Sequence, residues 1–125
     1  MSKKILVIDD EELIIRSLSK LLEKSGYETF IAKTGQDAII MVEEEDFNLI
    51  ISDIRMPGLN GIEAVKGIYD TLQQKNIEKP PVIFITGYAS KECEEEAKAL
   101  KPIDYIYKPF DIAKLVDRIE QTLGK

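Results

Sequence analysis

Acidic, hydroxyl and cationic side chains stand at the ends of short apolar runs at four places in the sequence. Asp9 and Asp10 follow the first of these runs, Asp53 ends a later one, Thr86 another and Lys108 the last. The chain contains no histidine, so chemistry that depends on an imidazole of this chain is excluded. Carboxylates beside a hydroxyl and an ammonium suit phosphoryl transfer, because an aspartate can act as nucleophile and form an acyl phosphate.

The charges of these side chains need a balance if they meet in one place. Three carboxylates about 6 Å apart, at an effective dielectric constant of about 20, repel each other by roughly 3 kcal/mol per pair. Lys108 can offset part of this repulsion, and a hard divalent cation can offset the rest. Ligands that are all oxygen favour Mg²⁺, which keeps several waters that a phosphate can replace. The residues therefore predict a Mg²⁺ site that supports phosphoryl transfer to a carboxylate.

The elements that must position these residues alternate between two kinds of segment. Short runs rich in β-branched residues predict strands at 5–8, 27–31, 49–51, 82–85 and 103–107. Longer stretches with helical apolar spacing predict helices at about 14–22, 34–42, 62–72, 91–100 and 112–123. Strands and helices that alternate in this way form a parallel sheet with right-handed crossovers.

The composition of the predicted strands indicates their order. The first, third and fourth are apolar throughout, as strands are when helices cover both faces of a sheet. The second and fifth contain polar residues such as Glu28 and Asp104, which is typical of sheet edges. We therefore predict an α/β fold with a single domain, a three-layer α/β/α sandwich of the flavodoxin-like kind with a five-stranded parallel sheet of order 2-1-3-4-5. Such sheets bind ligands outside the carboxyl ends of the first and third strands, where Asp10 and Asp53 fall.

The overall composition narrows the classes of partner. The 125 residues include 17 Lys and Arg against 23 Asp and Glu, a net charge of −6. This acidic balance argues against direct nucleic acid binding, which basic side chains carry. No apolar run approaches the roughly 18 residues that span a bilayer, and the single Cys93, expected to be a small core residue, can form no internal disulfide. We expect one domain over residues 1–125, in the cytoplasm and without membrane contact.

Four segments together resemble the receiver domain of response regulators in two-component signalling systems, the CheY-like family. They are VIDDE at 7–11, ISDIRMPG at 51–58, IT at 85–86 and YIYKPF at 105–110. The resemblance covers essentially the whole chain, with each segment at the end of a predicted strand. It implies a phosphorylation-switched signalling domain rather than an enzyme, with catalysis limited to its own phosphorylation and dephosphorylation.

The resemblance also implies roles for particular residues. Asp53 would be the phosphoacceptor, taking a phosphoryl group from the phosphohistidine of a sensor histidine kinase or a phosphotransfer protein. One Mg²⁺ would be bound by Asp10, Asp53 and the backbone carbonyl of Arg55, and Asp9 would assist through water. Lys108 would pair with the phosphoryl oxygens.

A second set of implied roles concerns the response to phosphorylation. Thr86 would move to hydrogen-bond the phosphoryl group, and Tyr105 would turn inward to fill the vacated space. The peptide bond before Pro109 should be cis, as the same resemblance implies. Arg55 and Tyr88 stand two residues after the acceptor and after the switch threonine, so their bulk should lengthen the lifetime of the acyl phosphate.

The output surface implied by the resemblance consists of the fourth predicted helix, the fifth strand and their loops. A downstream protein target, or an effector domain of a longer chain, would respond to this surface. Acidic runs at 43–46 and 92–96 are most simply solvated helix faces. A partner that docks on the second run would carry a basic patch.

Two other functions stay open on the residues alone. A Mg²⁺-dependent phosphohydrolase would also form an aspartyl phosphate, but no second aspartate stands two residues after Asp53 to act as general acid. A flavin- or nucleotide-binding module of the same fold would need glycines and backbone donors in the first strand–helix turn, where acidic residues stand.

Overall fold

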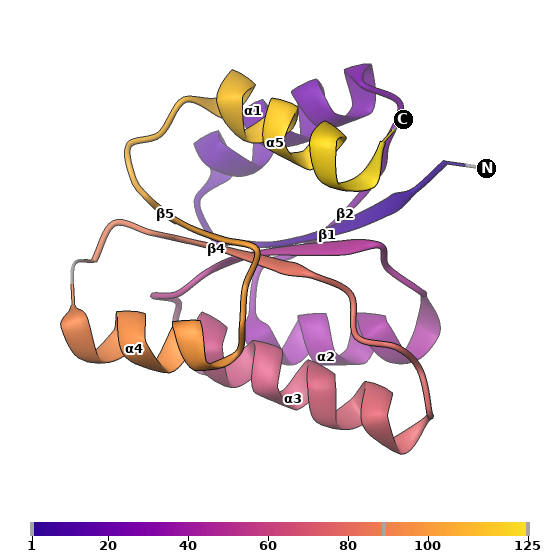
Figure 1. The fold of residues 1–125 in the computed structure, drawn as a ribbon, viewed down its shortest axis with the longest axis vertical. Helices are drawn as coiled ribbons and strands as arrows, with labels where there is room; N and C mark the ends of the chain where they lie inside the picture. Colours follow the sequence, from indigo (N-terminus) through magenta and orange to yellow (C-terminus); the bar gives the residue numbers. More distant parts are fainter. Residues whose placement is uncertain (1, 89, 125) are drawn as a thin grey trace.

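The structure, a computed structural model, describes residues 2–88 and 90–124 as a parallel sheet between two layers of helices (Figure 1). The strands are β1 (Lys4–Ile8), β2 (Glu28–Ala32), β3 (Leu49–Asp53), β4 (Val82–Thr86) and β5 (Asp104–Tyr107). The helices are α1 (Glu12–Lys24), α2 (Gly35–Glu44), α3 (Gly61–Gln74), α4 (Lys91–Ala99) and α5 (Ile112–Leu123). In Figure 1, α1 and α5 cover one face of the sheet and α2, α3 and α4 the other, which confirms the predicted three layers.

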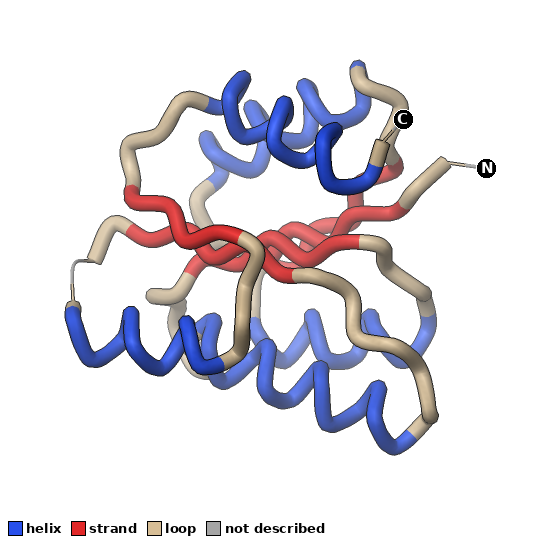
Figure 2. Tube along the Cα trace, viewed as in Figure 1, coloured by secondary structure: helices blue, strands red, loops and turns tan. Residues whose placement is uncertain are grey.

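The strand order is β2-β1-β3-β4-β5, as the sequence predicts. β1 is internal to the sheet: its Val7 lies opposite Ile31 of β2 on one side and Ile51 of β3 on the other. The strands run side by side through the middle of the molecule in Figure 2. Because the chain turns outward to β2 on one side of β1 and to β3 on the other, the carboxyl ends of β1 and β3 form the switch point.

Side chains that alternate along each strand divide the core into two apolar layers. Ile5 and Val7 of β1 belong to the layer beneath α1 and α5. Leu6 and Ile8 belong to the layer beneath α2, α3 and α4, where Phe84 is one of the largest fully buried side chains. With apolar side chains packed on both faces, the central strands hold their carboxyl ends in fixed positions.

Side-chain caps hold the starts of α2, α3, α4 and α5, whereas α1 has none in the described part of the chain. Thr34 Oγ1 accepts a hydrogen bond from the backbone N–H of Asp37 at 3.0 Å, as expected of an N-cap. The reciprocal capping box occurs at α3, where Asn60 and Glu63 each accept from the other's N–H, at 2.9 and 3.0 Å. Asp37 is one methylene shorter than Glu63, which limits its reach back to the cap.

Within residues 2–88 and 90–124 no helix is long and apolar enough to cross a membrane.

Burial is uneven across the sheet. Every residue of β3 and β4 is buried, whereas β5 has none that is fully buried. α4 buries only Ala97, and Cys93 packs against the core from a partly exposed position, so its predicted core role holds in part. The α4–β5 face, meaning α4, β5 and the side chains between them, is therefore the most thinly packed side of the sheet.

Candidate functional site

The carboxyl ends of β1 and β3 bring three aspartates together. Ile8 lies opposite Ser52 in the parallel register, so the residues that follow, Asp9 and Asp53, stand side by side. One carboxylate oxygen from each of Asp9, Asp10 and Asp53 lies within 4.8 Å of the others. Asp9 is completely buried and Asp53 nearly so, whereas Asp10 is exposed. All three carboxylates singled out in the sequence thus lie together at the carboxyl ends of the strands.

Lys108 brings a positive charge to this edge. Its Nζ donates to Asp53 Oδ2 at 2.9 Å, lies 3.6 Å from Asp9 Oδ2 and also donates to the Glu11 carboxylate. The backbone N–H of Lys108 donates to the Thr86 carbonyl at 2.8 Å, and the peptide bond to the following proline is cis, as predicted. Burial by itself would lower the pKa of Lys108, but its hydrogen bonds to Glu11 and Asp53 outweigh burial and raise the pKa.

Asp9 is the carboxylate with the poorest surroundings for a negative charge. Its Oδ1 accepts from the N–H of Glu11 at 2.9 Å, but its buried Oδ2 has no hydrogen bond among the described residues. Loss of solvent raises the pKa of Asp9 to about 6, and the charge of Asp53 acts in the same direction. A buried oxygen without a hydrogen bond, beside two further carboxylates, fits a hard divalent cation such as Mg²⁺.

Gly61, the first residue of α3, fixes the backbone at Asp53. The N–H of Gly61 donates to the Ile54 carbonyl at 2.7 Å, and Asp53 Oδ1 accepts from the N–H of Ile54 at 2.7 Å. A Cβ at Gly61 would stand 1.8 Å from the Asp53 carbonyl oxygen, a distance that no side chain can occupy. The sequence indicates only a turn at Asn60 and Gly61, and no local pattern reveals the close approach to Asp53.

Thr86 ends β4 with its hydroxyl turned into its own loop. Its Oγ1 accepts from the N–H of Tyr88 at 3.0 Å and lies 3.4 Å from the Tyr88 carbonyl oxygen. The guanidinium of Arg55 lies 4.4 Å from the centroid of the Tyr88 ring, so the two bulky side chains noted in the sequence contact each other. Both line a hollow of about 280 Å³ with Cys93. The backbone carbonyl of Arg55 as a metal ligand stays a prediction.

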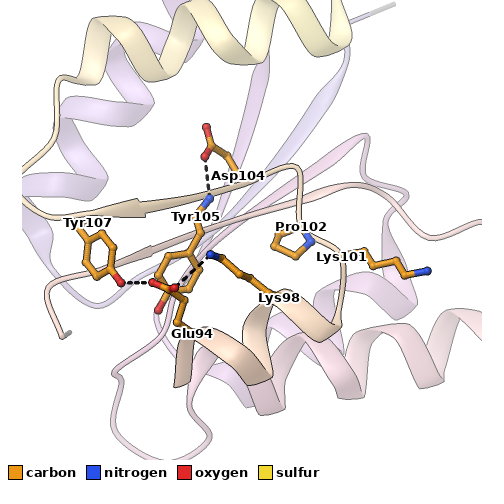
Figure 3. A pocket seen from close by; sticks show the side chains of 7 residues that line it. All are labelled: Glu94, Lys98, Lys101, Pro102, Asp104, Tyr105 and Tyr107. Atoms are coloured by element: carbon orange, nitrogen blue, oxygen red, sulfur yellow. Dashed lines mark hydrogen bonds and ion pairs between the residues drawn. The ribbon is translucent and has the colours of Figure 1, made fainter. Parts of the chain in front are cut away.

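The α4–β5 face carries a network of aromatic and charged side chains around a hollow of about 430 Å³ (Figure 3). The rings of Tyr105 and Tyr107 pack edge to face, 5.4 Å apart. Tyr107 donates its hydroxyl hydrogen to Glu94, which also accepts from Lys98 at 3.1 Å. Glu94 is therefore tied to β5, which corrects the expectation that the whole acidic run of α4 is a solvated face.

Tyr105, the predicted switch residue, lies at the edge of this hollow. Its hydroxyl is buried and has no hydrogen bond among the described residues. Burial, followed by the nearby Tyr107 and Glu94, raises the pKa of Tyr105 to about 12. The side chain thus keeps its proton at neutral pH while lacking an acceptor for it.

The doubly wound parallel sheet is a flavodoxin-like fold. The acidic residues and the lysine at its switch point form an anionic site that can bind a cation. The family model for the response regulator receiver domain matches residues 5–120 of the chain. The chain therefore belongs to the response regulator receiver domains of two-component signalling systems. Members of this family are generally signalling proteins rather than enzymes.

Named relatives agree with this assignment. The polar-differentiation response regulator DivK of Brucella ovis is 32% identical over 124 residues, which cover 99% of this chain and 98% of DivK. The crystal structure of a CheY-like receiver domain protein from Methanospirillum hungatei is 32% identical with a TM-score of 0.86, over 98% of this chain and 94% of that one. The chemotaxis protein CheY4 of Vibrio cholerae is 30% identical with a TM-score of 0.84, over 98% and 100%.

Proposed function

We propose that the chain is a phosphorylation-switched signalling domain in which Asp53 accepts a phosphoryl group. The donor is the phosphohistidine of a sensor histidine kinase or of a phosphotransfer protein. The observation that carries the proposal is the contact of Lys108 Nζ with Asp53 Oδ2 at 2.9 Å, beside two further carboxylates. An ammonium already placed on the acceptor carboxylate can stabilise the negative charge of the phosphoryl oxygens as they arrive.

The same site orients the acceptor carboxylate for the transfer. The N–H of Ile54 holds Asp53 Oδ1 at 2.7 Å, so the acceptor carboxylate is oriented before the donor binds. A carboxylate oxygen of Asp53 attacks phosphorus, the bond from phosphorus to the imidazole nitrogen breaks, and the imidazole leaves with the electron pair. Hydrolysis later returns the carboxylate of Asp53 and releases inorganic phosphate as water attacks phosphorus.

The proposed metal ligands follow from the same cluster. Asp10, Asp53 and the backbone carbonyl of Arg55 would hold one Mg²⁺, with Asp9 acting through water. The bound ion would supply positive charge to the phosphoryl oxygens. The buried Asp9 Oδ2, which lacks a hydrogen bond in the described part of the chain, supports a cation at this place.

The proposed switch links Asp53 to the α4–β5 face. Thr86 would exchange its contacts with Tyr88 for a phosphoryl oxygen, and Tyr105 would turn inward behind it. Thr86 of β4 lies opposite Tyr107 of β5, and Tyr105 stands two residues before Tyr107 on the same face of the sheet, so a change at Thr86 is close enough to affect Tyr105. The thin packing of α4 supports this face as the responding surface, because few buried contacts are lost when it moves.

The proposed partners are a phosphoryl donor and a protein target or effector domain, with the receiver domain spanning residues 1–125 in the cytoplasm. The exposed acidic residues Glu92, Glu95 and Glu96 on α4 favour a target with a basic patch. Such binding should weaken as the ionic strength rises, because salt screens exposed charges. Binding that is indifferent to salt would contradict the basic patch.

The decisive experiment is incubation with acetyl phosphate and Mg²⁺, followed by intact mass measurement. The wild-type protein should gain one phosphoryl group, Asp53→Ala should gain none, and the exposed control Asp70→Ala should behave as wild type. An adduct that persists in Asp53→Ala would refute the assigned acceptor. A turnover assay with phosphate esters separates this function from a phosphohydrolase, which would release phosphate over many cycles.

A further inference from the structure

Glu11 contacts the site through Lys108, with which it lines a hollow of about 330 Å³. It stands between Asp10 and the start of α1, and its backbone N–H donates to Asp9 Oδ1 at 2.9 Å. Its carboxylate pairs with Lys108 Nζ, although 54% of the Glu11 side chain is exposed and only 12% of the Lys108 side chain is. Glu11 is thus the solvent-exposed partner of a mostly buried ammonium.

Lys108 is shared among three carboxylates. Its ammonium donates to Glu11 and to Asp53 and lies 3.6 Å from Asp9. In the part of the chain that the structure describes, Lys108 is the cation that pairs with each of them. An ammonium has three N–H donors, and Glu11 and Asp53 engage two of them, so a phosphoryl group that takes more than one hydrogen bond from Lys108 displaces one of these partners.

The three partners differ in how easily they can give way. Asp9 is buried and held by a backbone N–H, and Asp53 is the group that the phosphoryl joins. Glu11 is exposed, and its side chain can turn into water with little loss, because an exposed ion pair contributes about 0 to 1 kcal/mol. Glu11 is therefore the partner that leaves.

We propose that Glu11 is a placeholder anion: a positioning residue that occupies Lys108 until the phosphoryl group replaces it. Its charge also repels anionic phosphoryl donors and slows their reaction with Asp53. This inference rests on the proposed function and deepens it. In the reaction with acetyl phosphate, a carboxylate oxygen of Asp53 bonds to phosphorus, and acetate leaves with the electrons of the broken phosphorus–oxygen bond. Lys108 transfers its hydrogen bond from Glu11 to a phosphoryl oxygen.

The first test compares Glu11→Gln with Glu12→Gln at low ionic strength. Both variants remove one negative charge without changing side-chain size, but Glu12 pairs with Lys33 on the outer side of α1 rather than with Lys108. Rates of phosphoryl gain from acetyl phosphate and Mg²⁺ are followed by intact mass. Glu11→Gln should react about fivefold faster than wild type, because one unit charge beside an incoming dianion is removed. Glu12→Gln should react at the wild-type rate.

Two further measurements separate a placeholder from a merely structural residue. Phosphoramidate carries one negative charge less than acetyl phosphate at neutral pH, so the gain from Glu11→Gln should be smaller with this donor. Glu11→Asp keeps the charge but is one methylene too short to hold the same contact, so its rate should fall between wild type and Glu11→Gln. The gain with acetyl phosphate should also shrink as salt is added.

The outcomes divide cleanly between this inference and the proposed function. Wild-type protein that gains no phosphoryl group refutes both. Wild-type protein that reacts, with Glu11→Gln no faster than Glu12→Gln, refutes the placeholder alone. Equal gains with both donors, or Glu11→Asp at the wild-type rate, also refute it, because neither result is compatible with an anion that competes for Lys108.

Discussion

β3 and α3 bury five and six residues respectively, whereas β5 and α4 together bury one. The first pair holds Asp53 of the carboxylate cluster, fixed between the N–H of Ile54 and the backbone of Gly61, while Asp9 and Asp10 follow β1 beside it. The predicted switch residue Tyr105 lies on the second pair, and its hydroxyl has no hydrogen bond among the described residues. The two regions are thus joined through one sheet but differ sharply in how firmly their side chains are held.

This contrast in packing explains how a small chemical change can have a distant effect in this domain. At the cluster, Lys108 offsets part of the repulsion between the carboxylates, and the buried strands hold them in place. At the α4–β5 face, contacts such as Tyr107 with Glu94 are exposed and can be exchanged at little cost. A new charge at Asp53 is therefore expected to leave the cluster in place and to move the α4–β5 face.

The strongest test of the rigid region is Gly61→Ala. The added Cβ would stand 1.8 Å from the Asp53 carbonyl oxygen, so β3 or α3 must shift, and we expect a loss of about 3 kcal/mol in the free energy of unfolding. Gly87→Ala is the matched control on the β4 side, because its Cβ would meet Lys108 at an ordinary 3.9 Å. It should change stability by less than about 0.5 kcal/mol. If denaturant unfolding shows similar losses of stability in Gly61→Ala and Gly87→Ala, the backbone at Gly61 is not the more tightly packed of the two.

Asp9→Asn tests the charge strain at the cluster. Because the pKa of Asp9 rises from 3.8 to about 6 on folding, the folded protein binds more protons than the unfolded one between these values. Without metal, wild-type stability should therefore fall as the pH rises from about 4 to about 6. Asp9→Asn should lack this fall and be more stable by about 2 kcal/mol at pH 7 in a chelator. If Asp9→Asn is less stable than wild type at pH 7, the buried charge of Asp9 does not destabilise the fold.

Substitutions of Arg55 and Tyr88 test the loops that lie between the carboxylate cluster and the α4–β5 face. Their stacked side chains stand beside the acceptor and the switch threonine, so Arg55→Ala and Tyr88→Ala should each shorten the phosphoryl lifetime about threefold. The double variant should lose little more than either single variant, because each change breaks the same stack. Lys79→Ala, which removes a similar stack on Tyr69, is the control. Lifetimes unchanged in both single variants would refute the prediction.

Tyr107→Phe tests the loose region with the smallest change. It removes the hydroxyl that binds Glu94, and global stability should change by no more than about 0.5 kcal/mol, since the pair is exposed. Amide hydrogen exchange of α4 should become about twofold faster, while that of α3 stays the same. Tyr69→Phe, which loses a hydrogen bond to the Pro80 carbonyl, should leave α4 unchanged. Faster exchange in α3 as well would mean that α4 is not a separately held unit.

The strand order and the place of the site follow from sequence patterns because both rest on backbone geometry. Apolar runs on both faces put β1, β3 and β4 inside the sheet, and parallel strands align their carboxyl ends. Asp9, Asp10, Asp53 and Lys108 could therefore be placed together without knowledge of any side-chain rotamer.

The contacts that the sequence does not reveal are those between side chains of different segments. Gly61 against Asp53, Glu11 against Lys108 and Tyr107 against Glu94 each join residues that are far apart in the chain or have no periodic pattern. Exposed, flexible side chains such as Glu94 have many rotamers in water, and only the packed surroundings select one. The predicted strand at 49–51 stops short of β3, which runs on through Ser52 to Asp53, because polar residues at a buried strand end break the apolar run.

The late position of Lys108 in the chain matters during synthesis. Lys108, which pairs with Asp53, is synthesised 55 residues after it. Until the residue after β5 has emerged, a nascent sheet of β1 and β3 has to balance its aspartates with protons or dissolved cations. Lys108 then supplies the protein's own counter-charge, so an unfinished polypeptide should depend on magnesium for order more than the finished one does.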